Sequence, residues 1–404
     1  MSGAPSSLRV TMATHYWEPH VGGIESVARR QAHALASRGI DVEVHTTRIP
    51  AAAAPVTEAP PTGGSGEVRI VRHRAIDPLA HSLQLPVPFP GAAMARALVR
   101  SAHRSDVVVA HGHSYPSSVM AARAACRARR PFVLVQHSPW VAYGGALDLL
   151  ERAVDASLGR AVIRAAARVV CVSEHTADYV RSIVPDVATV VIPNDVDDRF
   201  RPSAVRRAPS ATPTVLFVGR LVRRNGWTVL LDAWRRSGLE GRAELHVVGT
   251  GPDAPTIRAA VEPLRGVLLV GHVPDEELAD RYRAADVVVV PTVAGEGFGL
   301  VAAEALACGT PVIASAQGGL KEVVRDGQDG LLVPPGDAQA LASALRGVLE
   351  DVQLRARLAA GALVREPNDD GTRGGSVAAL LDVLREQVDA SRASVPIGAG
   401  TVAP

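Results

Sequence analysis

Short apolar runs alternate with longer amphipathic stretches along the whole chain. Apolar runs bounded by polar or turn-forming residues are typical of strands that a parallel sheet buries on both faces, and the amphipathic stretches between them are typical of crossover helices. In the first half the pattern predicts strands at Leu8–Ala13, Asp41–Thr46, Val68–Arg72, Val107–His111, Phe132–Gln136, Val169–Val172 and Thr189–Ile192. In the second half it predicts strands at Thr214–Val218, Glu244–Val248, Val267–Val270, Val287–Val290, Pro311–Ala314 and Leu331–Val333. The fold class is therefore α/β, with two open sheets whose ligand sites lie at the carboxyl ends of their strands.

The polar, proline-containing segment 201–213 separates the two series and is predicted to be a linker between domains. It divides the chain into an amino-terminal domain, 8–200, and a carboxy-terminal domain, 214–372. Two domains suit a chain of 404 residues, since a single hydrophobic core rarely serves more than about 250–300 residues. After a break rich in Gly, Asp and Asn, 373–389 is predicted to be a terminal helix and 390–404 a disordered tail.

Local signals predict the structure of two further segments. The clearest helix runs from Glu25 to Arg38, and Gly39 occupies the position at which glycine commonly ends a helix. Ala51–Glu67 is rich in Ala, Pro and Gly and has no periodicity. We expect a mobile surface loop there.

Composition excludes several classes of protein. The formal net charge of +2 gives no argument for nucleic acid, whose binding needs a concentrated basic face, and no nucleic-acid-binding motif occurs, so we expect no nucleic acid partner. The dispersed cysteines Cys126, Cys171 and Cys308 argue against a disulfide framework and against zinc. No apolar leader precedes the first strand, and no run of roughly 18 apolar residues occurs. We therefore expect a cytoplasmic protein.

The glycine-rich segment after Pro291 carries the strongest chemical pattern. An apolar strand ends there in E-G-F-G-L at Glu296–Leu300, and a helix opens at once, so that its free N–H groups can meet phosphate or sugar oxygens. Glu304 follows eight residues after Glu296, two helical turns deeper. Two carboxylates this far apart suit hydrogen bonds to two sugars of one ligand better than a shared proton.

The sequence E-G-F-G-L-V-x-x-E-A-x-x-x-G-x-P-V from Glu296 to Val312 resembles the signature of retaining glycosyltransferase family 4, the glycogen-synthase-like group 1 glycosyltransferases. The resemblance implies the GT-B fold, in which two Rossmann-like domains face each other across a cleft and the terminal helix crosses back to the first domain. It implies that Glu296 contacts the donor sugar and that Glu304 contacts the nucleotide ribose. The rest of the motif would line the donor site, at Gly297, Phe298, Gly299 and Leu300.

A cation at the carboxyl end of a strand suits a diphosphate, since a guanidinium stays charged and binds two oxygens at once. Arg220 holds this position after the first strand of the second half. The family pattern G-R-L-x-x-x-K-G implies that this arginine and a lysine neutralise the leaving diphosphate, but Asn225 stands where the lysine belongs. Three alternatives are open: Arg223 or Arg224 supplies the second cation, Arg220 alone supports weaker catalysis, or transferase activity is lost.

Strand ends in the first half supply further candidates. Gly22 and Gly23 follow the first strand, where paired glycines let a backbone approach a ligand, and the resemblance places this pair over the diphosphate. His137 matches the family histidine that contacts the donor sugar near the reacting carbon. His111 ends a predicted strand and His113 follows it, and at such positions a packed, hydrogen-bonded role is the alternative to a functional one.

Two turns of the second half complete the predicted donor site. Gly251 lies in G-T-G-P, and Val273 lies in G-H-V. The resemblance implies that the first is a turn of the donor-binding domain and that the backbone of the second reads the base.

We therefore expect a retaining, metal-independent hexosyltransferase that uses a nucleotide diphosphate sugar, UDP before GDP, with Arg220, Glu296 and His137 as catalytic residues. The nucleotide sugar is a co-substrate, and no cofactor is expected. The acceptor is left open as a small molecule, a lipid or a saccharide. A weak or inactive GT-B partner protein, motivated by Asn225, and a nucleotide-sugar epimerase are the alternatives. The basic stretch Arg152–Arg168 leaves peripheral contact with the inner face of a membrane open, and nothing indicates the oligomeric state.

Overall fold

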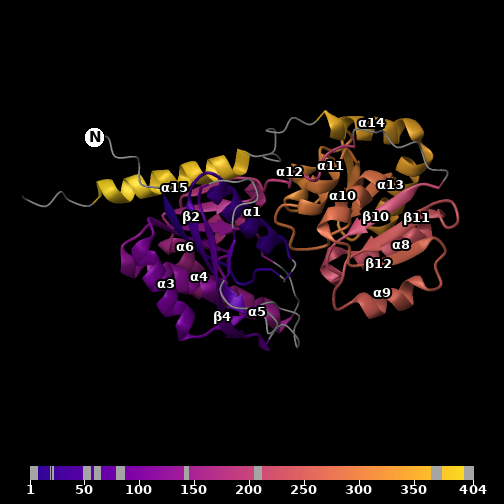
Figure 1. Ribbon diagram of the computed structural model, residues 1–404. Coiled ribbons are helices and arrows are strands. Elements are labelled where there is room, and N and C mark those ends of the chain that lie inside the picture. Colours follow the sequence, from indigo (N-terminus) through magenta and orange to yellow (C-terminus); the bar gives the residue numbers. More distant parts are fainter. Residues whose placement is uncertain are drawn as a thin grey trace, which may run out of the picture.

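The computed structural model describes residues 8–18, 20, 22–48, 56–58, 65–78, 87–140, 145–203, 212–364 and 375–394. It contains two α/β domains that lie side by side, each built on its own sheet (Figure 1). The expected fold class is confirmed.

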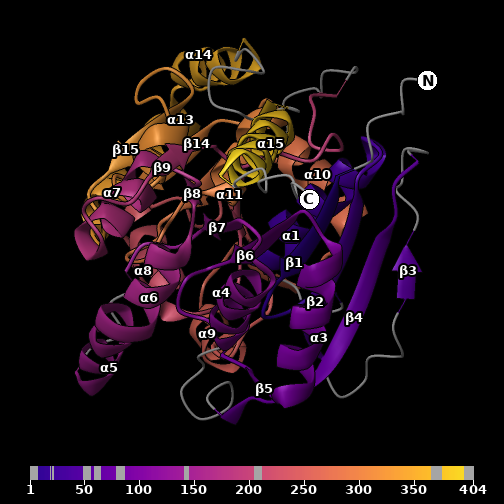
Figure 2. The ribbon, with the colours of Figure 1, turned by 90° about the vertical axis from the view of Figure 1, so that its left-hand side faces the viewer.

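The amino-terminal sheet has the order β3-β4-β2-β1-β6-β7-β8-β9, with β3 at one edge (Figure 2). Its strands are β1 (Arg9–Ala13), β2 (Asp41–Arg48), β3 (Val56–Glu58), β4 (Val68–Ile76), β5 (Phe89–Pro90), β6 (Val107–His111), β7 (Phe132–Gln136), β8 (Arg168–Cys171) and β9 (Thr189–Val191). All pairs are parallel except β3 and β5, which pair antiparallel with β4. The central strands are apolar throughout because both faces are covered: in β6, Val107 and Val109 enter one core while Val108 and Ala110 enter the other.

Helices cover both faces of this sheet. They are α1 (Gly23–Ser37), α3 (Ala92–Arg104), α4 (Pro116–Ala128), α5 (Ala146–Val154), the π-helix η1 (Asp155–Gly159), α6 (Arg160–Ala165) and α7 (Glu174–Ile183). The predicted helix at Glu25–Arg38 corresponds to α1, and Gly39 follows it with a φ of +82°, in the left-handed region that glycine adopts freely.

The carboxy-terminal sheet is wholly parallel, with the order β12-β11-β10-β13-β14-β15. Its strands are β10 (Thr214–Val218), β11 (Glu244–Val248), β12 (Val267–Gly271), β13 (Val287–Val290), β14 (Val312–Ser315) and β15 (Gly330–Val333). Its helices are the 3₁₀-helix η2 (Arg223–Asn225), α8 (Trp227–Ser237), α9 (Ala254–Val261), α10 (Asp275–Ala284), α11 (Leu300–Ala307), α12 (Leu320–Val323), α13 (Ala338–Glu350) and α14 (Val352–Leu363). They form separate apolar cores on the two faces of the sheet.

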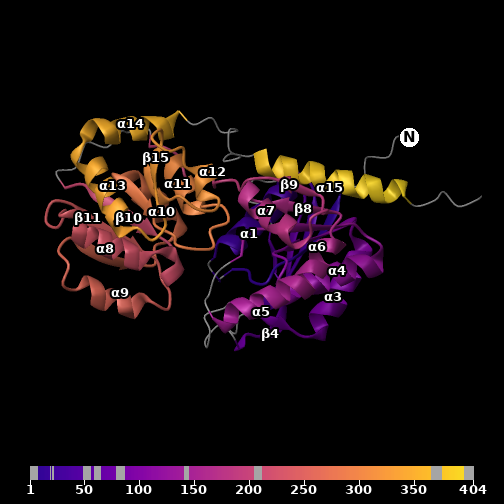
Figure 3. The same cartoon turned by 180° about the vertical axis from the view of Figure 1, so that it is seen from behind.

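The terminal helix α15 (Gly375–Ala393) lies along the amino-terminal domain, although the preceding helix, α14, belongs to the other domain (Figures 1 and 3). Leu380 and Leu384 pack in the same core as β1 and α1, and Ser376 N–H donates to the Asp195 carboxylate at 3.3 Å. Burial of this apolar face returns the chain to the first domain. Within the described ranges, no helix is long and apolar enough to cross a membrane.

Three expectations about chain segments need correction or lie outside the described residues. The tail was expected to begin at 390, but α15 continues to Ala393, where Arg392 forms an ion pair with Asp106 at 3.1 Å. The expected loop at Ala51–Glu67 contains the short strand β3, because its residues 56–58 find an unpaired edge of β4. The remainder of that loop from 51 to 64, linker residues 204–211 and tail residues 395–404 lie outside the described residues.

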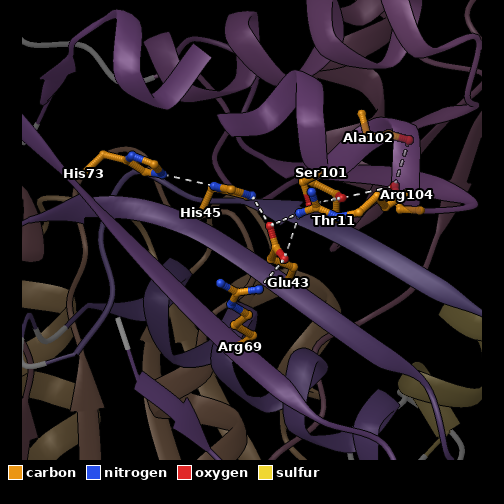
Figure 4. A network of polar contacts seen from close by, with 9 residues as sticks. Thr11, Glu43, His45, Arg69, His73, Ser101, Ala102 and Arg104 are labelled. Carbon is orange, nitrogen blue, oxygen red and sulfur yellow. Dashed lines mark hydrogen bonds and ion pairs between the residues drawn. The ribbon is translucent and has the colours of Figure 1, made fainter. Parts of the chain in front are cut away.

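A polar network joins β2, β4 and α3 within the amino-terminal domain (Figure 4). His45 Nδ1 lies 3.0 Å from His73 Nε2, and His45 Nε2 lies 3.1 Å from the Glu43 carboxylate. Arg104 and Arg69 approach the same carboxylate at 3.4 and 3.6 Å. The hydrogen bond from His45 lowers the pKa of Glu43 to about 2 despite partial burial, while burial lowers the pKa of His73 to about 4.

Candidate active site

A cleft of about 1420 Å³ separates the carboxyl ends of the two sheets and is lined by both domains. The domains touch around it. Ser173 Oγ, at the start of α7, donates to the carbonyl oxygen of Gly297 at 2.6 Å. The Glu322 carboxylate of α12 accepts the N–H groups of Glu174 and His175 at 2.9 and 3.0 Å. These contacts join the start of α7 in one domain to the Gly297 loop and to α12 in the other.

The loop between β13 and α11 forms the floor of the carboxy-terminal half. Gly299 precedes α11 with a φ of +100°, a conformation that favours glycine. The Glu296 carboxylate accepts the N–H groups of Phe298 and Gly299, so it is fixed at the start of the helix. A Cβ on Gly297 would lie 1.8 Å from the carbonyl oxygen of His137. The glycine at 297 therefore lets this loop reach the other domain.

Both glutamates of the motif are held in low-dielectric surroundings. Burial is the main cause that raises the pKa of Glu296, and the nearby Arg224 opposes it. Burial likewise raises the pKa of Glu304 to about 7, although Arg30 of α1 and a hydrogen bond from Tyr282 Oη at 2.9 Å stabilise the anion. Such perturbed carboxyl groups in a cleft are typical of ligand sites.

The cations and Asn225 lie at the start of the carboxy-terminal domain. Arg220 and Arg224 line the cleft, whereas Arg223 is exposed and is not among the described residues that line it. Asn225 Nδ2 donates to the carbonyl oxygen of Arg220 at 2.8 Å, so the amide supports the arginine backbone. Gly226 must be glycine, since a Cβ would lie 1.8 Å from the carbonyl oxygen of Pro291. Of the two arginines offered by the sequence, the geometry favours Arg224 as a second cation.

Histidines gather on the amino-terminal wall. His111 Nδ1 lies 2.8 Å from His137 Nε2, and both rings are buried. The Glu25 carboxylate lies 3.3 Å from His15 Nε2 and 3.1 Å from His20 Nδ1. Burial lowers the pKa of His15 to about 4 and that of His137 to about 3, so both rings are neutral near pH 7.

A buried aspartate, Asp155, holds two side chains of the amino-terminal wall, close to these histidines. Asp155, in the π-turn η1, lies 2.8 Å from His113 Nε2 and also accepts a hydrogen bond from Tyr179 Oη. The turn brings Gly159 so close that a Cβ would lie 2.7 Å from the His113 ring. A π-turn of this kind often occurs at a functional site. His113 and Tyr179 both line the cleft.

The structure brings every predicted site residue to this one cleft. They are Gly22, Gly23, His137, Arg220, Arg224, Asn225, Gly251, Val273, Glu296, Gly297, Phe298, Gly299, Leu300 and Glu304. Sequence reasoning missed Glu25, Arg30, Asp155 and Tyr179. Arg30 lies on the face of α1 that lines the cleft, and the helical spacing of the sequence could have indicated it. No sequence signal pairs Asp155 with Tyr179.

No metal centre was expected. In the part of the chain that the structure describes, no three His, Cys, Asp or Glu side chains are grouped as ligands for a metal ion would be.

Comparisons with known proteins agree with this architecture. Residues 21–200 match the model described as "Glycosyltransferase Family 4", and residues 212–351 match "Glycosyl transferases group 1". The chain is 34% identical, over 93% of its length and 88% of the relative's, to D-inositol 3-phosphate glycosyltransferase of Geodermatophilus obscurus. It resembles the structure of sucrose-phosphate synthase from Thermosynechococcus elongatus, with a TM-score of 0.74, 25% identity and coverage of 95% and 100% of the two chains. Anabaena HepE in complex with UDP-glucose has a TM-score of 0.70 at 20% identity, over 95% and 100% of the chains.

The two facing domains, the crossing terminal helix and the cleft between them define a glycosyltransferase of the GT-B fold. The chain belongs to glycosyltransferase family 4.

Proposed function

We propose that the protein is a retaining, metal- and cofactor-independent glycosyltransferase that moves a sugar from a nucleotide diphosphate sugar, with UDP as the first nucleotide to consider. The observation that carries the proposal is the joint placement of Arg220, Glu296, Glu304 and His137 around one cleft. The UDP-glucose bound to HepE, whose fold is similar, supports the choice of nucleotide.

Each group has a role that its surroundings support. Arg220 and Arg224 neutralise charge that develops on the leaving diphosphate, a stabilisation that is strong where water is excluded. Glu304 accepts hydrogen bonds from the ribose, and Glu296 accepts them from sugar hydroxyls. Gly22 and Gly23 line the same space at the start of α1, and a helix N-terminus favours an anion. Catalysis then depends on positioning and on electrostatic stabilisation.

The acceptor binds against the amino-terminal wall, which His113, Tyr179 and Glu25 help to form. The relative from Geodermatophilus obscurus is named for D-inositol 3-phosphate, and we propose a small polyol of this kind as the first acceptor to test. The alternative of an inactive partner protein rests on Asn225 alone. The hydrogen bond of this amide to Arg220 and the cleft position of Arg224 favour an active site.

A panel of UDP-, GDP- and ADP-sugars tests the proposal by thermal shift and by release of nucleotide. A ligand at 100 times its Kd stabilises a protein by about 2.7 kcal/mol, and we expect this from UDP-sugars with wild type but not with Arg220→Ala. Binding without nucleotide release, with or without D-inositol 3-phosphate, would favour the inactive partner. Stabilisation by none of the panel would contradict the donor site. The anomeric configuration of the product, determined by NMR, tests retention.

A further inference from the structure

His111 and His137 form a stacked pair at the carboxyl ends of two neighbouring strands. β6 and β7 are parallel, with His111 the last residue of β6 and His137 the first after β7. The ring centroids are 5.1 Å apart, the planes differ by 17°, and His111 Nδ1 lies 2.8 Å from His137 Nε2. The neighbouring strand ends thus bring one nitrogen of each ring together, and the other two nitrogens face different surroundings.

The two remaining nitrogens differ in whether a ligand can reach them. His111 is fully buried, and its Nε2 has no hydrogen-bond partner among the described residues. His137 lines the cleft, and its Nδ1 forms no hydrogen bond within the same described part of the chain. Burial keeps both rings neutral, because it lowers both pKa values far below 6.5. Each ring therefore carries one N–H, and only two arrangements of the pair make the hydrogen bond between them.

The two arrangements do not cost the same. If His137 Nε2 donates to His111, then the proton of His111 is on Nε2, where a buried N–H points at no acceptor. If His111 Nδ1 donates to His137, the buried Nε2 carries only a lone pair. Orphaned buried N–H groups are the rarer of the two in native proteins. The second arrangement leaves His137 with its proton on Nδ1, toward the cleft.

We propose that His111 is a positioning residue that fixes His137 in the Nδ1–H form, so that His137 presents a hydrogen-bond donor to the cleft. The group that it recognises is an oxygen lone pair, such as a hydroxyl or ring oxygen of a sugar. That this oxygen belongs to the donor sugar rests on the proposed function, whereas the tautomer of His137 does not.

The tautomer can be measured without any substrate. The wild-type protein is labelled with ¹⁵N in its 13 histidines, and long-range ¹H–¹⁵N correlation spectra are recorded near pH 7.5, with His137→Gln to assign the signals. We expect a protonated Nδ1 and an unprotonated Nε2 in His137, and the same protonated Nδ1 in His111. A protonated Nε2 in His137 would overturn the proposal, whatever nucleotide sugar the transferase uses.

Kinetics then test the positioning role with matched variants. The amide nitrogen of Asn can take the place of Nδ1, whereas Gln places its amide where Nε2 lies and Phe has no donor. We expect His111→Asn to keep activity within about threefold, and His111→Gln and His111→Phe to lose about tenfold in kcat/KM for the donor, the effect of one hydrogen bond. KM for the acceptor should not change.

His73→Phe is the control for loss of a paired histidine that does not line the cleft, and it should retain wild-type kinetics. Circular dichroism and thermal unfolding show whether each variant folds. Equal activity of His111→Asn, His111→Gln and His111→Phe, or an equal loss in all three, would contradict the positioning role.

Discussion

The amino-terminal domain contains two pairs of buried histidines on neighbouring parallel strands, and the pairs have different surroundings. His45 and His73 join Nδ1 to Nε2 at 3.0 Å, and His111 and His137 do so at 2.8 Å. In the first pair a carboxylate, Glu43, holds the far nitrogen of His45. In the second pair no carboxylate among the described residues touches either ring, and one ring lines the cleft.

The difference shows how one local arrangement serves two purposes. Glu43 fixes the proton of His45 on Nε2, and the whole chain of hydrogen bonds ends on arginines at the surface (Figure 4). Both ring nitrogens of His45 and both oxygens of the Glu43 carboxylate have partners within the protein, which suits a structural role. In the cleft, His137 keeps one nitrogen uncommitted, which suits a ligand. The first pair should therefore affect stability, and the second should affect turnover.

Removal of the His137 ring, which lines the cleft, should have the largest effect on activity. We expect His137→Ala to lower kcat by about 10²–10³, by analogy with loss of an oxyanion-hole donor, and to cost about 1–3 kcal/mol of stability because buried His111 loses its partner. His45→Ala should leave kcat unchanged and lower the free energy of unfolding more, because it interrupts the contacts to both His73 and Glu43. Initial rates with a UDP-sugar and chemical denaturation of both variants test this. If both variants are fully folded and lose activity equally, the division between the pairs is wrong.

The next largest effect should be a loss of stability at low pH, because the pair of His45 and His73 is then disrupted. The pKa of His73 is lowered to about 4, so its neutral form stabilises the fold, and this stability declines as the pH falls from about 6.5 to about 4. The pKa of Glu43 is lowered to about 2, so its contribution is present above about 4.5 and is lost as the pH falls toward 2. Glu43→Gln should cost about 2 kcal/mol at pH 7, allowing for solvent screening.

Denaturant midpoints between pH 7 and pH 3 measure both effects. The matched control is His73→Phe, which should flatten the decline between pH 6.5 and 4 and leave the steeper loss below it. A Glu43→Gln protein with the stability of wild type at every pH would show that this network is dispensable.

The sequence predicted the strands of the cleft far better than the side-chain networks. β6, β7, β10, β11 and β13 have their predicted bounds, because valine-rich runs buried on both faces have few alternatives. β3 and β5 were missed because two or three residues at a sheet edge carry no periodicity. The histidine pairs depend on the register between strands, and Asp155 meets His113 across 42 positions through a π-turn. Such contacts are properties of the packed fold and leave no local pattern.

Glu304, a buried acid in the carboxy-terminal domain, differs from both histidine pairs because its charge changes close to neutral pH. Burial raises the pKa of Glu304 to about 7, so its neutral form is favoured and the fold loses stability as the pH rises from about 4.5 to about 7. The ionised carboxylate accepts hydrogen bonds from both ribose hydroxyls more strongly than the protonated acid does. The affinity for UDP-glucose, which itself does not titrate in this range, should therefore rise about tenfold between pH 6 and pH 8.

Isothermal titration calorimetry of wild type and Glu304→Gln checks this dependence. The variant should bind more weakly at pH 8 and show no change between pH 6 and pH 8. A wild-type affinity that is constant over this range would mean that Glu304 is already ionised, or that it does not meet the ribose.

The smallest effect is expected at Asn225, where a lysine would restore the family pattern. The structure gives the amide one function, a 2.8 Å hydrogen bond to the carbonyl oxygen of Arg220. Asn225→Lys loses this bond but adds a cation beside the diphosphate, and Arg224 already supplies charge on the same wall. Since one neutral hydrogen bond contributes only about 1 kcal/mol, we expect activity equal to wild type or a few-fold higher. Asn225→Ala, which loses the bond and gains no charge, should be a few-fold lower. A tenfold drop in Asn225→Lys with an unchanged Asn225→Ala would show that a cation is harmful here, and that the site has adapted to a single arginine pair rather than lost a lysine.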